Sequence, residues 1–337
     1  MDYLKSQFHD FLNEEGEVEI AGHTFYRDVI LRDLEVDGYQ EAFNEWLQQK
    51  QEENLSFADE ILSCYDNSGR FRKLQEIHRR GAIIPFVGAG LSMPSGYSGW
   101  TTFLYRVLSE TRISKTDFDA LITSGSYEEA AQMLFDNLPS GSFLEQIENE
   151  FGTEREITGS VQRLPYLFKN AVITTNFDSI VTKCYSNAAL GFEKELLGAD
   201  AQYLSRELGE NKRVLVKLHG EADSSRNRIF TKSEYQHHYS DQSVLENVIE
   251  VISNRTLLFI GCSLSVDRTI QALTNIVQRR GSENVPRHYA FLQLQDEDER
   301  LKRRDVLATA NIYPIWYKDD HNKCIEALLE KLAEGVN

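Results

Sequence analysis

The stretch Ala82-Ile83-Ile84-Pro85-Phe86-Val87-Gly88-Ala89-Gly90, residues 82–90, decides the fold class of this chain. Its first part is an uncharged apolar run of the length of one strand, and the run ends directly in a glycine turn. A strand that is apolar throughout is typical of a parallel sheet covered by helices on both faces. The stretch therefore predicts a buried strand followed by a tight glycine-containing loop.

Apolar runs of the same kind recur along the chain, at residues 171–174, 214–218, 257–260, 288–292 and 312–316. Amphipathic helical stretches lie between them. Strands that alternate with helices indicate an α/β fold with a Rossmann-like, doubly wound parallel sheet. Residues 100–170 hold only helical patterns, so we expect a helical insertion there, packed over the ligand crevice.

The beginning of the chain has a different character. Residues 1–70 are predicted to form an acidic, mainly helical N-terminal extension, and residues 71–337 a single domain, with a turn signal at Asn67-Ser68-Gly69. Residues 1–67 hold 17 acidic and 4 basic side chains, so they carry most of the net charge of −17. Two interpretations of this acidic segment remain open: a solvated surface, or an arm that docks to a basic partner or a sister subunit.

Composition excludes several classes of protein. The apolar runs, Thr256 to Ile260 among them, are far shorter than the ~20 residues of a membrane helix, and no secretory signal is expected. The acidic charge argues against nucleic acid as a non-specific partner, because phosphate contacts need Lys and Arg. Four scattered cysteines predict a cytoplasmic protein with free thiols, without a disulfide framework or a structural zinc site: Cys64, Cys184, Cys262 and Cys324.

Glycine-rich and polar motifs follow four of the predicted strands, at the edge where open α/β sheets bind ligands. In chain order they are Gly88-Ala89-Gly90-Leu91-Ser92, Thr175-Asn176-Phe177-Asp178, His219-Gly220 and Gly261-Cys262-Ser263. Glycine lets the backbone approach a pyrophosphate closely, and a helix start offers unpaired N–H groups to an anion. A His followed by Gly at a strand end suits a general base. The joint occurrence indicates a ligand site.

Each motif also has an ordinary structural interpretation. The glycine pair suits a tight turn without a ligand, and Ser92 suits a helix N-cap. The Asn-x-Asp pair suits a cap for the following helix, and His219 suits a surface or core histidine. Cys262 is interpreted as a small buried residue, because no His is predicted beside it. His237-His238 is interpreted as a solvated helix surface instead of a metal site.

Taken in order, the set resembles the sirtuin superfamily of NAD-consuming enzymes, over about residues 82–335. The first motif looks like the family's phosphate-binding loop, and the second like its Thr-x-Asn-hydrophobic-Asp motif. The third looks like the catalytic His-Gly, and the fourth like the Gly-x-Ser ribose and adenine loop. Trp100 stands where sirtuin-like proteins often carry an aromatic near a substrate loop. Thr231 to Tyr235 resembles a Thr-x-x-x-Tyr segment, and the Thr231 to Glu234 spacing predicts a capping box.

The resemblance implies NAD as substrate and cleavage of its nicotinamide–ribose bond. Asn176 would position the attacking water, and His219 would act as a base with a pKa useful near neutrality. Asp178 would orient the ribose or stabilise positive charge, and a role only as a helix cap remains open. Gly88, Ala89, Gly90 and Ser92 would hold the pyrophosphate, and Gly261 and Ser263 the adenosine ribose. The expected binding residues are Gly88, Ala89, Gly90, Ser92, Trp100, Thr175, Gly261 and Ser263.

The chain departs from protein-deacylating sirtuins, which carry a four-cysteine zinc module soon after the catalytic His-Gly. No cysteine lies between His219 and Cys262, so no zinc is expected. The branch that fits is the bacterial sirtuin-like NAD hydrolases of antiphage defence, which deplete NAD on infection. This implies a homo-oligomer, or a protein partner such as a translocase-type ATPase or another phage sensor. Two alternatives remain open: an NAD or ADP-ribose sensing module without cleavage, and a zinc-free NAD-dependent protein deacylase.

Overall fold

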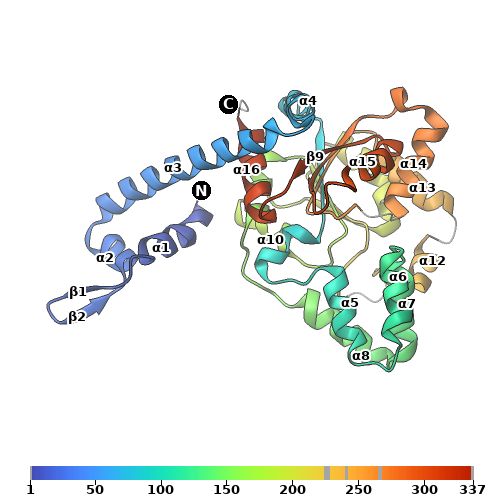
Figure 1. The fold of residues 1–337 in the computed structure, drawn as a ribbon, viewed down its shortest axis with the longest axis horizontal. Helices are drawn as coiled ribbons and strands as arrows, with labels where there is room; N and C mark the ends of the chain where they lie inside the picture. Colours follow the sequence, from blue (N-terminus) through green and yellow to red (C-terminus); the bar gives the residue numbers. More distant parts are fainter. Residues whose placement is uncertain (1, 224–227, 240–241, 265–267, 335–337) are drawn as a thin grey trace. The chain divides into compact units, whose positions relative to one another are not determined.

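The computed structural model describes residues 2–223, 228–239, 242–264 and 268–334 (Figure 1). Its packing divides the chain into two compact units, Met1–Glu60 and Ile61–Asn337. The division falls inside helix α3, Val36–Ser63, which is longer than any other helix described.

The N-terminal unit has an aromatic core. It contains η1 Asp2–Leu4, α1 Lys5–Asn13, β1 Val18–Ile20, β2 His23–Phe25, α2 Arg27–Leu34 and the first part of α3. Phe8 packs on Phe43 and Trp46, with ring centroids 5.3 and 5.6 Å away. The β1–β2 hairpin is not predicted from the sequence, because its strands are only three residues long and mostly exposed. Its two-residue turn, Ala21-Gly22, has φ of 54° and 82°, the backbone that tight hairpins prefer.

The second unit is built on a seven-stranded parallel sheet with the strand order β5-β6-β4-β3-β7-β8-β9. The strands are β3 Ile83–Val87, β4 Ala171–Thr174, β5 Lys194–Leu197, β6 Val214–Lys217, β7 Thr256–Ile260, β8 His288–Gln293 and β9 Ile312–Tyr317. All six apolar runs form strands, which confirms the predicted α/β fold. Apart from β5, the order is that of a doubly wound sheet, and the direction of winding reverses between β3 and β7.

Strand β5 is missed by the sequence pattern for a physical reason. It lies at the edge of the sheet, pairs only with β6, and reads Lys194-Glu195-Leu196-Leu197. The first two side chains are exposed, and only Leu196 is buried. An edge strand with one covered position needs no continuous apolar run, so its sequence does not stand out.

Helices cover both faces of the sheet. α13 Gln242–Ile252 and α14 Arg268–Arg280 pack on the face that carries Phe86 and Phe259. α4 Asn67–Arg79 packs on the opposite face, where Phe71 stacks on Phe291 of β8 with centroids 6.3 Å apart. The other helices that follow strands are α10 Ile180–Asn187, α11 Leu204–Gly209, α12 Lys232–His238, α15 Arg300–Thr309 and α16 His321–Ala333.

A helical layer separates β3 from β4 along the chain. It comprises α5 Trp100–Leu108, α6 Lys115–Thr123, α7 Tyr127–Asn137, α8 Ser140–Ile147 and α9 Leu164–Leu167. Figure 1 shows α5 to α8 grouped together below the sheet. Short turns complete the unit at η2 Ala89–Leu91, η3 Met93–Ser95, η4 Glu148–Gly152, η5 Ser160–Arg163, η6 Gly198–Tyr203 and η7 Ser282–Asn284. The layer therefore covers the edge at which β3 and β4 end.

Candidate active site

The four sequence motifs lie together at the carboxyl ends of β3, β4, β6 and β7. The Gly90 N–H donates to the Gly261 carbonyl at 2.9 Å, which joins the first motif to the fourth. The Asn176 amide donates to the Gly88 carbonyl at 3.1 Å, which joins the second motif to the first. The rings of Phe177 and His219 lie 6.2 Å apart, which joins the third motif to the second. Parallel pairing is what brings these strand ends to one edge.

The glycines of the first and fourth motifs pack backbone against backbone. A Cβ on Gly88 would lie 2.5 Å from the Gly261 carbonyl oxygen, and one on Gly90 would lie 2.9 Å from the same atom. Gly261 has a φ of +70°, and its Cβ would lie 2.7 Å from the Leu91 nitrogen. The expectation that this loop holds a pyrophosphate stays a prediction, and the structure adds a packing role for its glycines. The neighbouring loop fills the space beside their Cα atoms, and loop–loop packing is what requires glycine.

Most amide groups of the first loop are already paired. Gly90 donates to the Gly261 carbonyl at 2.9 Å, Leu91 to the Gly88 carbonyl at 3.1 Å, and Ser92 to the Ala89 carbonyl at 2.9 Å. Within the described part of the chain, the Ala89 N–H makes no such bond. In this conformation the Ala89 amide is therefore available to an anion. The amides of Gly88, Gly90 and Ser92 are not, because they are already bonded.

Three buried side chains of the site interact in sequence. The Asn176 amide donates to Ser92 Oγ at 3.0 Å, and Ser92 in turn acts to lower the pKa of the Asp178 carboxyl. Asp178 Oδ1 also accepts the N–H of Ile180, the first residue of α10, at 3.0 Å, although the N-cap position of this helix is Ser179. Ser92 stands at the N-cap position of η3, but its side chain makes no capping bond there. We call these side chains the polar half of the site: Ser92, Asn176, Asp178 and Lys217.

Burial governs the charge of Asp178. It raises the pKa of this carboxyl above its usual range, while the hydrogen bond from Ser92 and the positive charge of Lys217 act in the opposite direction. Lys217, at the end of β6, is only 3% exposed, and its Nζ lies 3.3 Å from Glu221 Oε1. Asp178 therefore makes its contacts inside the protein, with Ser92 and with the start of α10.

Asn176 carries an unpaired polar atom. Its Nδ2 donates to both Ser92 and the Gly88 carbonyl, which fixes the orientation of the amide. Its Oδ1 is buried and has no hydrogen-bond partner among the described residues. Leaving such an acceptor unpaired costs about 1–3 kcal/mol, so a water or hydroxyl that donates to it is favoured. The amide is thus held with its oxygen ready for a ligand.

Aromatic rings surround His219. The indole of Trp100 lies 5.2 Å from the imidazole, stacks on Phe177 at 5.5 Å and contacts Phe230 at 4.8 Å. Tyr235 meets the imidazole edge-on, with the two rings at 76°. We call this group the aromatic half of the site: Trp100, Phe177, His219, Phe230 and Tyr235.

The expected pKa of His219 is wrong. Burial lowers it to about 4, against the smaller opposing effect of the Thr175 carbonyl. The physical reason is desolvation, because the surrounding rings cannot solvate a charged imidazolium. His219 is therefore neutral at pH 7. Its Nε2 forms a 2.6 Å hydrogen bond with the Tyr235 hydroxyl, and its Nδ1 is buried without a partner among the described residues.

Glu150 holds the loop that precedes Trp100. Its carboxylate accepts the Ser98 N–H at 2.7 Å and a bond from Arg106 at 2.8 Å, and Arg155 lies 3.5 Å away. Burial acts to raise the pKa of Glu150, but these partners outweigh it and hold the pKa below its usual range. Glu150 therefore stays charged and ties the Trp100 loop to the helical layer.

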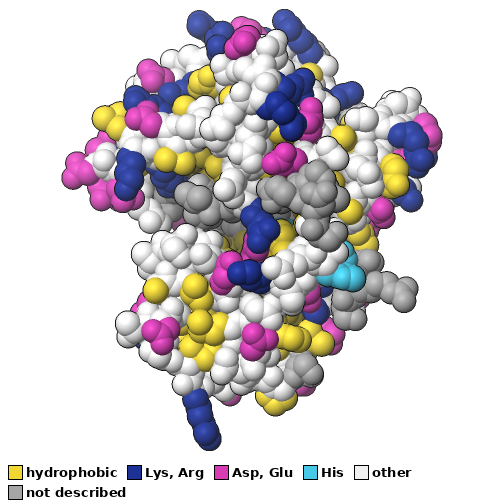
Figure 2. All heavy atoms as spheres, turned by 90° about the vertical axis from the view of Figure 1, so that its right-hand side faces the viewer, with side chains coloured by type: hydrophobic (Ala, Val, Ile, Leu, Met, Phe, Trp, Pro, Cys, Tyr) yellow, Lys and Arg dark blue, Asp and Glu magenta, His cyan; other side chains and the backbone are white. Residues whose placement is uncertain are grey.

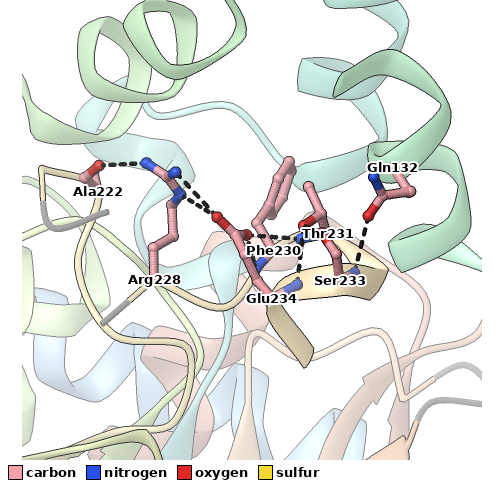
Figure 3. A network of polar contacts seen from close by, with 7 residues as sticks. All are labelled: Gln132, Ala222, Arg228, Phe230, Thr231, Ser233 and Glu234. Atoms are coloured by element: carbon pink, nitrogen blue, oxygen red, sulfur yellow. Dashed lines mark hydrogen bonds and ion pairs between the residues drawn. The ribbon is translucent and has the colours of Figure 1, made fainter. Parts of the chain in front are cut away.

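A second polar network holds the start of α12 (Figure 3). Thr231 and Glu234 form the predicted capping box, which is confirmed. Glu234 also pairs with the buried Arg228 at 3.1 Å, and Arg228 donates to the Ala222 carbonyl. From the helical layer, Gln132 accepts the Ser233 N–H at 2.9 Å. This network fixes the segment from which Tyr235 reaches His219.

The remaining expected residues are placed less centrally. Thr175 is partly buried and acts on the site through its backbone carbonyl. The Ser263 side chain is exposed, and its carbonyl accepts a bond from Arg303. Tyr235 and Lys217 are site residues that sequence reasoning did not select. The sequence signal for Tyr235 was only its place in the segment Thr231 to Tyr235, which resembles one in sirtuin-like proteins. Lys217 gave no signal, because it lies inside an apolar run.

Charged side chains of both signs are interspersed on the face seen in Figure 2, which is also hollowed at its middle. Among the described residues, no three His, Cys, Asp or Glu side chains gather as metal ligands would. All four cysteines are described, and none forms a disulfide. No helix in the described ranges has the length and apolarity needed to span a membrane.

Known proteins resemble this chain over the same region. Residues 170–315 match the SIR2-like domain family. The NAD(+) hydrolase ThsA of Enterococcus faecium is 24% identical over 231 residues, 68% of this chain and 46% of that protein. The defense-associated sirtuin 2 of Bacillus subtilis is 22% identical, over 67% of this chain and 21% of that protein. A solved Sir2 homolog–NAD complex has a TM-score of 0.40 and 12% identity, over 79% of this chain and 95% of that chain.

The chain thus spans less than half the length of these curated relatives. The matched region, 170–315, contains the second, third and fourth motifs. The predicted resemblance is confirmed to this extent: residues 170–315 match the SIR2-like domain family, and the chain is similar to proteins named NAD(+) hydrolase ThsA and defense-associated sirtuin 2.

Proposed function

We propose that this protein hydrolyses NAD+ at the bond between nicotinamide and ribose. The observation that carries the proposal is the buried, unpaired Oδ1 of Asn176, fixed beside the Gly88 loop and one residue before Phe177, whose ring lies 6.2 Å from that of His219. A water that donates to this oxygen is held in one place, as hydrolysis requires. Similarity to proteins named NAD(+) hydrolase supports the same reaction.

In the proposed reaction the C–N bond breaks and its electron pair goes to nicotinamide, which leaves uncharged. The ribose becomes oxocarbenium-like, water forms the new C–O bond, and one proton is released. Asn176 positions the water. Neutral His219 is in the form that accepts a proton or a hydrogen bond, although its low pKa favours orienting a hydroxyl over full proton transfer. Asp178 supports Asn176 through Ser92.

The binding roles follow from the same geometry. We assign the pyrophosphate first to the Ala89 amide and the loop Gly88–Ser92, and the adenosine ribose to Gly261 and Ser263. Trp100 and Thr175 line the nicotinamide side of the site. Because one amide of the loop is available, substrate binding must rearrange the loop or rely on other groups for the second phosphate.

We further propose that the reaction depletes NAD in bacterial antiphage defence, within the cytoplasm and without zinc. Similarity to a protein named defense-associated sirtuin 2 supports this setting. The chain would act in a homo-oligomer or with a separate sensor protein. The acidic N-terminal unit, with exposed Tyr26, Leu34 and Val36, is the region we assign to that assembly.

A sensing module that binds NAD without cleaving it is the second candidate. One observation favours it: the Tyr235 hydroxyl occupies His219 Nε2, so this nitrogen is engaged before any substrate arrives. Under this alternative the protein binds NAD or ADP-ribose, and no nicotinamide appears.

The deciding experiment is incubation of the full chain with NAD+ and quantification of free nicotinamide and ADP-ribose. Stoichiometric release that stops in His219→Ala supports hydrolysis. His237→Ala, an exposed histidine on α12, is the matched control and should retain full activity. Binding of NAD+ without nicotinamide release would establish the sensing alternative instead.

A further inference from the structure

We propose that Tyr235 is a positioning residue for His219, which holds the imidazole in one orientation and one tautomer through its hydroxyl. The catalytic consequence of this inference rests on the proposed NAD cleavage, whereas the contact itself does not. Tyr235 comes from α12, and its hydroxyl lies 2.6 Å from His219 Nε2. Only 7% of the Tyr235 residue is exposed, so water does not compete freely for this bond.

A neutral imidazole has one N–H and one lone pair, and its neighbours decide which nitrogen carries the proton. If the Tyr235 hydroxyl donates to Nε2, the proton resides on Nδ1. The Thr175 carbonyl, which stabilises the protonated ring, is the acceptor on hand for that proton, although Nδ1 makes no hydrogen bond of ordinary geometry with a described residue. We therefore assign the Nδ1–H tautomer to His219, with Tyr235 as donor.

Tyr235 is itself braced from the far side. The Arg268 guanidinium, at the start of α14, lies 4.9 Å from the centre of the phenol ring. Arg268 is paired with Glu128 of α7 at 2.7 Å. The capping box at Thr231 and Glu234 fixes the first turn of α12, on which Tyr235 stands. The hydroxyl therefore has little freedom to leave His219, and the helical layer contributes to its placement.

This arrangement makes turnover depend on Tyr235. The aromatic rings hold the imidazole plane, but ring packing does not determine which nitrogen is protonated. The Tyr235 hydroxyl, bonded to Nε2, does. Any proton or hydrogen bond that His219 accepts at Nε2 has to pass through this hydroxyl or displace it.

The test compares Tyr235→Phe with Tyr239→Phe in the full chain. Both changes remove a buried phenol hydroxyl from the same segment. That of Tyr239 bonds to the Leu218 carbonyl at 3.3 Å and not to His219. Histidine-selective ¹⁵N NMR reports the tautomer of His219, with His219→Gln to assign the signal. Thermal melting shows that each variant is folded.

Wild type and Tyr239→Phe should show the Nδ1–H form alone, and Tyr235→Phe should show a mixture or the other tautomer. With NAD+, Tyr235→Phe should lower kcat about tenfold, the effect of one hydrogen bond, and leave KM within about twofold. Identical ¹⁵N signals in folded Tyr235→Phe and wild type would overturn the proposal. A wild type that releases no nicotinamide would refute the proposed hydrolysis and leave the NMR comparison to decide the role of Tyr235.

Discussion

The two halves of the candidate site orient their key side chains by opposite means. In the polar half, Asn176 is held by two donated hydrogen bonds, to Ser92 and to the Gly88 carbonyl. In the aromatic half, His219 is held by rings and by one hydroxyl. Burial also pushes the two titratable groups toward their uncharged forms, because it raises the pKa of Asp178 and lowers that of His219.

The difference shows how one motif at a strand end, Thr175 to Asp178, can contribute to both halves of the site. Hydrogen bonds fix direction, so the polar half can present a single unpaired oxygen in a defined place. Ring packing fixes a plane and removes water, so the aromatic half keeps an imidazole neutral at physiological pH. Phe177 lies between Asn176 and Asp178 in sequence yet belongs to the aromatic half, and this links the two.

The largest expected effect comes from removing one key side chain from each half. Asn176→Ala and His219→Ala should each lower NAD turnover by ~10²-fold or more, since each removes a positioned group. Nicotinamide release measures the loss. Asn187→Ala, an exposed asparagine at the end of α10, and His237→Ala are the matched controls.

If both halves act on the same step, the double variant Asn176→Ala/His219→Ala should lose less NAD turnover than the product of the two single fold-losses. Full NAD turnover in folded His219→Ala would remove the aromatic half from the mechanism and leave the polar half alone.

Gly261→Ala should break the loop packing on which the polar half depends. Its φ of +70° and a Cβ 2.7 Å from the Leu91 nitrogen should lower the free energy of unfolding by about 2 kcal/mol. Denaturant unfolding measures this. The control is Gly209→Ala, where an added Cβ meets nothing within 4 Å. Equal stability of the two variants would contradict the packing argument.

Ser92→Ala should separate Asn176 from Asp178 without changing the aromatic half. We expect kcat to fall about tenfold, because the amide loses one of its two orienting bonds. Ser95→Ala removes another buried hydroxyl nearby, one that contacts Thr158, and should leave kcat unchanged. Equal kcat values for the two serine variants would show that the chain through Ser92 is not needed.

A further expected effect concerns pH. The unfolded chain protonates His219 near its ordinary pKa of about 6.5, whereas the folded protein resists protonation down to about pH 4. The unfolded state thus binds more protons in this window, so the free energy of unfolding should fall as the pH falls from about 6.5 to about 4. His219→Gln should weaken that dependence. Thermal melting at several pH values checks it, and an unchanged slope would argue against a buried neutral His219.

Much of the fold could be predicted because buried parallel strands consist of continuous apolar runs. Six strands were found in this way, and β5 and the β1–β2 hairpin were not, because short or edge strands need few apolar residues. The site motifs could be located because they directly follow those runs. Their contacts could not, since a hydrogen bond such as Tyr235 to His219 joins residues from different elements.

The sequence alone determined the fold class, the edge of the sheet that bears the candidate site, and the resemblance of the motifs around Asn176 and His219 to those of sirtuins. Those properties depend on local residue types in chain order. Only the tertiary structure decided that Gly88, Gly90 and Gly261 serve loop packing, and that His219 is neutral and bonded to Tyr235. Steric fit and desolvation arise from atoms that the fold brings together, so no local pattern in the sequence encodes them.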